Sequence, residues 1–235
     1  MTVVNLPTSI DAGSAADPAP KRPRGRPRKT MDERDDGNRR QELLSAAARL
    51  FRDKGFSATS TRDIAGAVGM HSGSPFYHFK SKDALLFAVM EAGMHAAIAR
   101  QALALQADEA DAQAPQIPAL TPRAPQAQIR RLIRAHFETL LGPGNDFVPV
   151  MLYEHRSLSP RQRTVLAQLQ LDYEAAWMPV LQALHASGQL NAPVKLSRLL
   201  ILGALNWSVQ WFDPGKAASL DDLTDAAMAL FFKAC

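Results

Sequence analysis

The stretch that most constrains this chain is residues 60–82, which predicts two short helices joined by a tight turn. Ser60 is a favourable N-cap, and Asp63 three residues later can complete a capping box. An apolar stripe at helical spacing follows, and Gly69 provides a stop signal. Residues 70–73 contain a glycine and suit the turn of a helix-turn-helix.

The second helix of this unit, residues 74–79, is too short to be stable alone. It carries polar side chains at Ser74, Tyr77 and His78. Pro75 falls in its first turn, where the missing N–H costs little. A short helix that is held by its neighbours and presents such side chains is suited to reading the major groove of DNA. The unit therefore predicts a DNA-binding protein.

The positive charge of the chain is concentrated in an N-terminal arm. Residues 21–29 hold six basic side chains and no acidic one, although the formal charge of all 235 residues is only +4. Residues 1–38 contain few large apolar side chains, so we expect them to be disordered. A basic arm ahead of a folded body indicates a polyanionic partner. The alternative is a solvated arm that only aids solubility.

The centre of this arm resembles an AT-hook, a motif that lies along the minor groove of A·T-rich DNA. A glycine permits close approach of the backbone, prolines keep the arm extended, and arginines are attracted to the potential of a narrow groove. The resemblance implies that the minor-groove contacts come from Arg24, Gly25, Arg26, Pro27 and Arg28.

The remainder of the chain predicts an all-α fold, because no stretch alternates with a period of two. Ser81 is the expected N-cap of a long helix, and Ser159 with Gln162 forms another capping box. Pro179 is expected to bend the helix that contains it. Outside the unit described above, we expect helices over residues 39–54, 82–106, 126–141, 146–156, 160–185, 193–212 and 219–232.

No pattern in the sequence indicates an enzyme. It contains no Gly-rich phosphate loop, no nucleophile elbow and no Cys-x-x-Cys or His-x-x-x-His spacing, so we expect no catalytic residue, metal or cofactor. The only cysteine is Cys235, and no apolar signal-peptide core precedes the arm, which predicts a cytoplasmic protein near the nucleoid. Residues 194–212 are apolar but are interrupted by Lys195 and Arg198, which indicates a buried helix rather than a membrane span.

Three motifs together resemble the TetR/AcrR family of bacterial regulators across residues 39–95. They read Ala-Arg-Leu-Phe-x-x-x-Gly-Phe, then Ser-Thr-Arg-Asp-Ile-Ala-x-x-Val-Gly, then Gly-Ser-x-Phe-Tyr-His-Phe-Lys-Ser-Lys-Asp-x-Leu-Leu. The resemblance implies a homodimer whose two recognition helices enter the major grooves of a palindromic operator in double-stranded DNA, usually as a repressor. Pro75 departs from the family pattern, which has a large apolar residue there, and so removes an apolar anchor of the helix.

The same resemblance assigns roles to individual side chains. It implies phosphate contacts from Thr61, Tyr77 and Lys82. It places Ser72, Gly73, Ser74 and His78 facing bases or backbone. The DNA-binding residues expected in this unit are Ser60, Thr61, Ser72, Gly73, Ser74, Tyr77, His78 and Lys82.

Residues 202–216 are similar to a TetR subgroup that responds to acyl-CoA ligands from fatty-acid or steroid breakdown. The resemblance implies a small-molecule effector and divides the chain into residues 1–38 (arm), 39–85 (DNA-binding domain) and 86–235 (helical ligand-binding and dimerisation domain). Arg156 is the candidate partner for an acidic ligand head, with a surface salt bridge as the alternative. The two C-terminal tryptophans can line a pocket, or else fill the core or the dimer interface. The expected ligand-binding residues are Met151, Tyr153, Arg156, Trp177, Asn206, Trp207 and Trp211.

One other function fits the sequence. An architectural protein that uses its basic arm would bind any A·T-rich duplex with similar affinity, whereas a regulator would prefer a palindrome.

Overall fold

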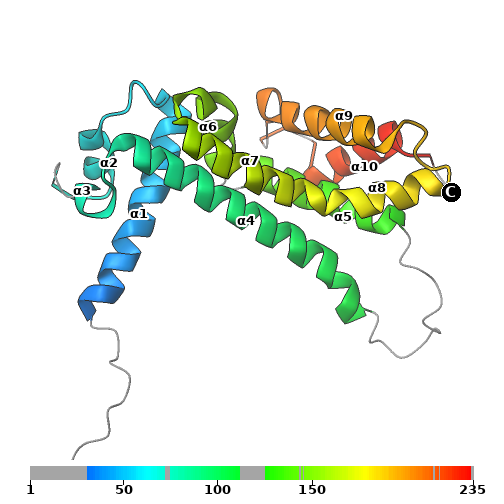
Figure 1. The fold of residues 1–235 in the computed structure, drawn as a ribbon, viewed down its shortest axis with the longest axis horizontal. Helices are drawn as coiled ribbons and strands as arrows, with labels where there is room; N and C mark the ends of the chain where they lie inside the picture. Colours follow the sequence, from blue (N-terminus) through cyan, green and yellow to red (C-terminus); the bar gives the residue numbers. More distant parts are fainter. Residues whose placement is uncertain are drawn as a thin grey trace, which may run out of the picture.

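The computed structural model describes residues 31–71, 75–111, 125–142, 144, 146–213, 215–216 and 218–233. All of the regular elements in these ranges are helices, which confirms the all-α prediction. In Figure 1 the first three helices gather at one end of a long helix, α4; α5, α6 and α7 pack along it, and α9 and α10 lie on the side away from it. No helix in the described ranges is both long and apolar enough to cross a membrane.

The helices alternate with short connections along most of the chain. They are α1 (Met31–Lys54), α2 (Thr61–Ala67), α3 (Pro75–His78), α4 (Lys82–Asp111), α5 (Pro125–Leu141), α6 (Phe147–Glu154), α7 (Pro160–Ala175), α8 (Trp177–Ala186), α9 (Val194–Trp207) and α10 (Leu220–Phe231), with 3-10 turns at His155–Ser157 and Ser208–Gln210.

The capping residues begin their helices where the sequence predicts. Ser60 and Asp63 form a reciprocal capping box at the start of α2, and Ser159 with Gln162 forms another at the start of α7. The hydroxyl of Ser81 accepts a hydrogen bond from the backbone N–H of Ala84, in the first turn of α4, at 3.1 Å. Each of these bonds satisfies a donor that the helix itself leaves unpaired.

Two helices are longer than predicted. The first helix was expected to begin at Arg39 with Asn38 as its N-cap. α1 begins instead at Met31, and Asn38 donates to Glu42 Oε1 at 3.2 Å within the helix. α4 continues to Asp111 rather than ending near Gln106. Neither extension adds a large apolar stripe, and both are free of proline, so the pattern of buried positions gave no sign of them. The AT-hook-like residues of the arm lie outside the described part of the chain.

The helix predicted over residues 160–185 is divided at Ala176, close to Pro179, and the backbone of Ala176 remains in the right-handed helical region. α7 ends at Ala175 and α8 begins at Trp177. Proline has no N–H to donate to the carbonyl four residues earlier, which is that of Ala175, and its ring crowds the same carbonyl. This confirms the predicted site of the bend and explains its position.

The long helix α4 belongs to both halves of the molecule. One continuous cluster of buried apolar side chains includes Phe51 of α1, Met90 of α4 and Leu181 of α8. α4 packs against α1 at one end and against α5 and α7 farther along. The domain boundary expected at residues 85 and 86 therefore falls inside an uninterrupted helix.

A glycine allows α4 and α6 to approach each other closely. A Cβ atom added at Gly93 of α4 would overlap the ring of Phe147 of α6, whereas one added at Gly66 of α2 would have nothing within 4 Å. The ring therefore occupies space that a side chain at residue 93 would need.

We predict opposite effects on stability for alanine at these two helical glycines. Gly66→Ala gains helix propensity of up to about 1 kcal/mol in the free energy of unfolding. Gly93→Ala gains the same propensity but incurs an overpacking cost of about 1–3 kcal/mol, so we expect a net loss. Urea unfolding of both variants measures the difference. Equal stability of the two variants would show that the α4–α6 contact is loose.

Candidate DNA-binding surface and effector cavity

The turn between α1 and α2 is held by a glycine, an aromatic pair and a buried threonine. Gly55 ends α1 with a φ of +81°, and the chain turns back so that the rings of Phe51 and Phe56 meet edge to face, 5.4 Å apart. Thr59 is almost fully buried, and its hydroxyl donates to the carbonyl of Gly55 at 2.8 Å. This turn is therefore a fixed platform for the helices that follow.

The recognition helix α3 is anchored at both ends. Pro75 at its start is buried, although the sequence predicted that proline removes an apolar anchor at this position. Phe79, directly after the helix, is also buried, and the guanidinium of Arg40 lies 5.0 Å from the centre of its ring. A helix this short depends on such neighbours because it cannot form alone.

Between these anchors, α3 presents Tyr77 to solvent. The side chain of Tyr77 is 93% exposed, an unusual position for an aromatic residue with no intramolecular role. Thr61, the first residue of α2, and His78 of α3 are half-buried in the same unit. Ser60 is occupied with its capping box. The predicted base-facing residues Ser72, Gly73 and Ser74 lie outside the described part of the chain.

Lys82 has a role that the sequence did not suggest. Its ammonium donates to the carbonyls of Phe56 and Thr59, at 2.8 and 2.9 Å, and lies 4.3 Å from the centre of the Phe56 ring. These two bonds tie the start of α4 to the turn after α1. Because an ammonium has three N–H groups, one remains for a further partner.

Two contacts join α6 to α1 and to the turn after α1, which together support the DNA-binding unit. Glu154 Oε1 accepts a hydrogen bond from the backbone N–H of Phe56 at 2.8 Å. Asp146, at the other end of α6, pairs with Arg52 of α1. Both partners are far from α6 in sequence, so no local pattern indicates these contacts.

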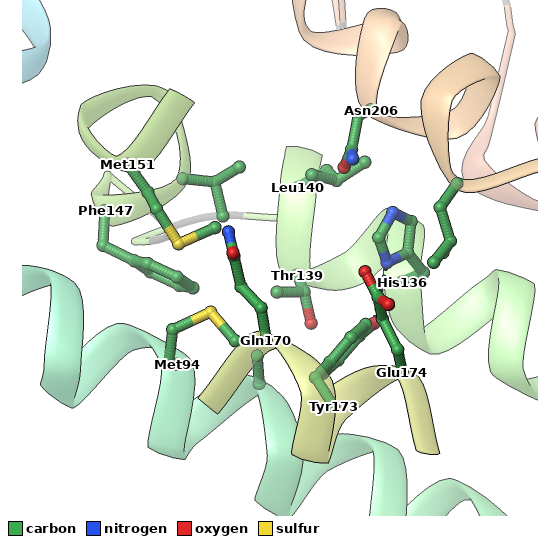
Figure 2. Close-up of a pocket in the computed structure, with 13 residues that line it drawn as sticks. Met94, His136, Thr139, Leu140, Phe147, Met151, Gln170, Tyr173, Glu174 and Asn206 are labelled. Carbon is green, nitrogen blue, oxygen red and sulfur yellow. Dashed lines mark hydrogen bonds between the residues drawn. The ribbon is translucent and has the colours of Figure 1, made fainter. Parts of the chain in front are cut away.

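A cavity lies between α4, α5, α6, α7 and α9 (Figure 2). It encloses about 550 Å³ of space, including its open side. Its apolar wall consists of Met94, Ala97, Leu140, Phe147, Val148, Met151 and Leu202. Its polar wall consists of His136, Thr139, Gln170, Tyr173, Glu174 and Asn206.

The structure brings two of the predicted ligand-binding residues to this cavity. Met151 of α6 and Asn206 of α9 line it. Trp177 does not line it but is fully buried next to it, where its ring meets that of His136 edge to face at 5.8 Å. Trp177 therefore supports the wall from behind.

The other four predicted ligand-binding residues lie away from the cavity. Tyr153, Trp207 and Trp211 are 58%, 65% and 57% exposed, and Arg156 is also exposed. Each step along a helix turns the side chain by about 100°, so Tyr153 and Trp207 face away from the cavity although their near neighbours line it. Without knowledge of the packing, the sequence did not distinguish these faces.

A buried polar network that the sequence analysis missed forms one wall. The amide of Gln101 donates to the carbonyl of Tyr173 at 2.9 Å and accepts from the indole N–H of Trp177 at 2.7 Å. Nδ1 of His136 lies 2.7 Å from the hydroxyl of Tyr173. The available signal was His136 itself, one of two polar positions, with Thr139, on the otherwise apolar buried face of α5.

This wall is electrically neutral. Burial lowers the pKa of His136 to about 4, and the nearby amide of Asn206 opposes this shift only in part. Burial also raises the pKa of the Tyr173 hydroxyl. The carboxylate of Glu174 is paired with Arg198 of α9. At neutral pH the cavity therefore offers hydrogen-bonding groups but no unpaired cation among its lining residues.

Comparison with known proteins places both halves of the chain. Residues 43–89 match the family model for bacterial regulatory proteins of the tetR family, and residues 122–235 match that for the tetracyclin repressor-like C-terminal domain. The HTH-type transcriptional repressor KstR2 of Rhodococcus jostii (strain RHA1) is 26% identical, over 82% of this chain and 88% of its own length.

Two solved structures show the same fold. The crystal structure of superantigen PfiT is 34% identical, with a TM-score of 0.67, and the match covers 83% of this chain and 97% of that one. The crystal structure of AibR in complex with isovaleryl coenzyme A and operator DNA is 22% identical, with a TM-score of 0.70, over 83% of this chain and 98% of that one.

Proposed function

The chain belongs to the TetR family of bacterial regulatory proteins, and we propose that it is a homodimeric repressor that a small-molecule effector releases from its operator. Family membership confirms the helix-turn-helix prediction and makes the chain a DNA-binding transcription factor rather than an enzyme. The observation that carries the proposal is that α6 lines the cavity and also holds the DNA-binding unit through Glu154 and Asp146. We place its action in the cytoplasm, where bacterial operators are found.

We propose that Tyr77 and Thr61 contact phosphates, and that the remaining N–H of Lys82 does so too. The exposure of Tyr77 supports this, because its hydroxyl is accessible at the outer side of α3. Contacts to phosphates fix the position of a protein on the duplex without reading its sequence. We propose that Ser72, Gly73, Ser74 and His78 face bases or backbone, and the basic arm remains a prediction for neighbouring A·T-rich DNA.

We predict that Tyr77→Phe weakens operator binding by about tenfold, the value of one hydrogen bond to a charged group. The loss should be similar across operator variants, and protein stability should not change because the hydroxyl is exposed. Fluorescence anisotropy with labelled duplexes measures both the loss and its uniformity. Tyr153→Phe, an exposed tyrosine of α6, is the matched control and should bind normally. A loss confined to one operator position would instead make Tyr77 a base-reading residue.

We propose that α9 and α10 form the dimer interface. α9 has one buried stripe, which includes Ile201 and Leu205, and a second apolar stripe that faces solvent. The exposed apolar side chains of this second face are Leu196, Leu199, Leu200, Trp207 and, from α10, Leu230. A patch of this kind is typical of a protein–protein contact, and a two-fold partner would pair two recognition helices for a palindrome.

We expect Leu200→Glu to convert the dimer to a monomer, because it places a charge in the apolar contact. Leu103→Glu is the matched control, since Leu103 of α4 has the same exposure of 66%. Sedimentation velocity reports the oligomeric state of both variants. If Leu200→Glu remains dimeric, the interface lies on another face of the molecule.

We propose that the effector is of the acyl-CoA type, with its acyl part in the cavity and its nucleotide part outside. The likeness of residues 202–216 to acyl-CoA-responsive regulators supports this class, and the neutral, largely apolar cavity suits an acyl group better than a charged nucleotide. A ligand shifts an equilibrium only through different affinities for the two shapes of the protein. Displacement of α6 by the acyl group would give that difference, because α6 also contacts the DNA-binding unit.

The release proposal is tested on an operator located by footprinting of the DNA around the protein's own gene. Acyl-CoAs of increasing chain length and a steroid-derived CoA thioester are titrated against the labelled complex, with free CoA as the control. We expect at least one thioester to lower operator affinity at micromolar concentration, whereas free CoA does not. If no thioester changes the affinity, the acyl-CoA class is wrong although the assignment to the TetR family is unaffected.

A further inference from the structure

One ring nitrogen of a buried histidine in the cavity has no partner. His136 is 6% exposed and lines the cavity from α5. Its Nδ1 is bonded to the hydroxyl of Tyr173, but its Nε2 has no hydrogen-bond partner among the described residues. In Figure 2 the ring lies between Tyr173 on one side and Asn206 on the other. Asn206 is close enough to raise the pKa of His136 but does not complete a hydrogen bond to Nε2.

The hydrogen bond to Tyr173 determines which nitrogen of His136 carries the proton. The indole N–H of Trp177 is already donated to Gln101, so it does not compete for the Tyr173 hydroxyl. A phenol O–H is a stronger acid than a neutral imidazole N–H, so the hydroxyl of Tyr173 donates its proton to Nδ1 of His136. In a neutral imidazole the other nitrogen then carries the hydrogen. Nε2 of His136 is accordingly an unused N–H donor at the cavity wall.

The charges around this donor restrict what it can bind. The carboxylate of Glu174 lines the same wall and is already paired with Arg198. A free carboxylate in the cavity would meet a neutral imidazole and this carboxylate, with no unpaired cation among the lining residues to compensate for its lost hydration. An uncharged acceptor avoids that cost and satisfies the N–H.

We propose that the cavity selects effectors whose enclosed part is apolar and carries one uncharged hydrogen-bond acceptor, such as a ketone, ester or thioester carbonyl, that accepts from Nε2 of His136. This inference rests on the effector cavity of the proposed function and adds the feature that the cavity recognises. It names His136 as the residue that determines specificity. Hydrocarbons without a carbonyl and free carboxylic acids of the same size are disfavoured ligands.

Three probes of similar size test this selectivity on the full-length protein without DNA. Butyrophenone has a neutral carbonyl, butylbenzene has no polar group, and 4-phenylbutyrate has a carboxylate. Calorimetric titration should show that butyrophenone binds about tenfold more tightly than either of the others, the effect of one satisfied buried donor. This comparison uses the wild-type protein and does not depend on any variant. Failure of butyrophenone to bind, or equal binding of the three probes, would overturn the proposal.

Two variants then test the assignment to His136. His136→Leu removes the donor. Butyrophenone and butylbenzene should then bind this variant with about equal affinity, while binding of butylbenzene persists. Thr139→Val is the matched control, because the Thr139 hydroxyl lines the cavity but is already bonded to the carbonyl of Ala135 at 2.9 Å. Its preference should equal that of the wild type. A preference for butyrophenone that survives in His136→Leu would place the donor elsewhere.

The outcome is separable from that of the release proposal. Selective binding of butyrophenone with no acyl-CoA effect on the operator complex would support the carbonyl site and contradict acyl-CoA release. Release of the operator by a thioester, with no selectivity among the three probes, would support acyl-CoA release and contradict the carbonyl site.

Discussion

One hydrogen bond between a carboxylate and a backbone amide joins the cavity helix α6 to the turn before α2. Glu154 at the end of α6 accepts from the N–H of Phe56, in the turn that carries the DNA-binding unit. A bond to an ionised acceptor is stronger than one between neutral groups, and the bond is partly shielded from water. The Asp146–Arg52 pair fixes the opposite end of α6 to α1. α6 is thereby attached at one end to the turn before α2 and at the other end to α1, which together support the DNA-binding unit.

α6 is also a wall of the cavity, so the Glu154–Phe56 bond links the cavity to the turn before α2. Phe147 and Met151 face the cavity, and the ring of Phe147 fits against α4 only because residue 93 has no side chain. Close packing of this kind transmits displacement, since it leaves little space for a side chain to move independently of its helix. Under the proposed function, occupation of the cavity would act on the unit that contains Tyr77 through α6, and through α4, which begins at Lys82.

The parts of this structure that follow from local chemistry were predictable, and the parts that join distant segments were not. Ser60 with Asp63 and Ser159 with Gln162 mark helix starts, and Pro179 marks a break, because each acts on backbone groups within four residues. The Glu154–Phe56 bond joins residues that are 98 positions apart, and no sequence pattern near either residue indicates it. The family motifs identified the DNA-binding unit because they, like the capping residues, lie within one continuous segment of the sequence.

The cavity shows where sequence reasoning reaches its limit. Aromatic residues were expected to line it, but Trp207 and Trp211 are exposed. Asn206 lines the cavity only one position away from Trp207. The polar group of greatest interest, His136, lies in a stripe that reads as ordinary core. Which face of a helix meets a cavity depends on packing between helices, and one sequence does not contain that information in local form.

The most direct test of the coupling between cavity and DNA-binding unit compares the effector response of two proteins. Operator Kd is measured with and without a saturating acyl-CoA, for the wild type and for Glu154→Leu, with Tyr153→Phe as a control on the same helix. If α6 transmits the signal, the wild type and the control should lose about tenfold or more in operator affinity, whereas Glu154→Leu should lose no more than about threefold. An identical loss in all three proteins would contradict transmission through the Glu154–Phe56 bond.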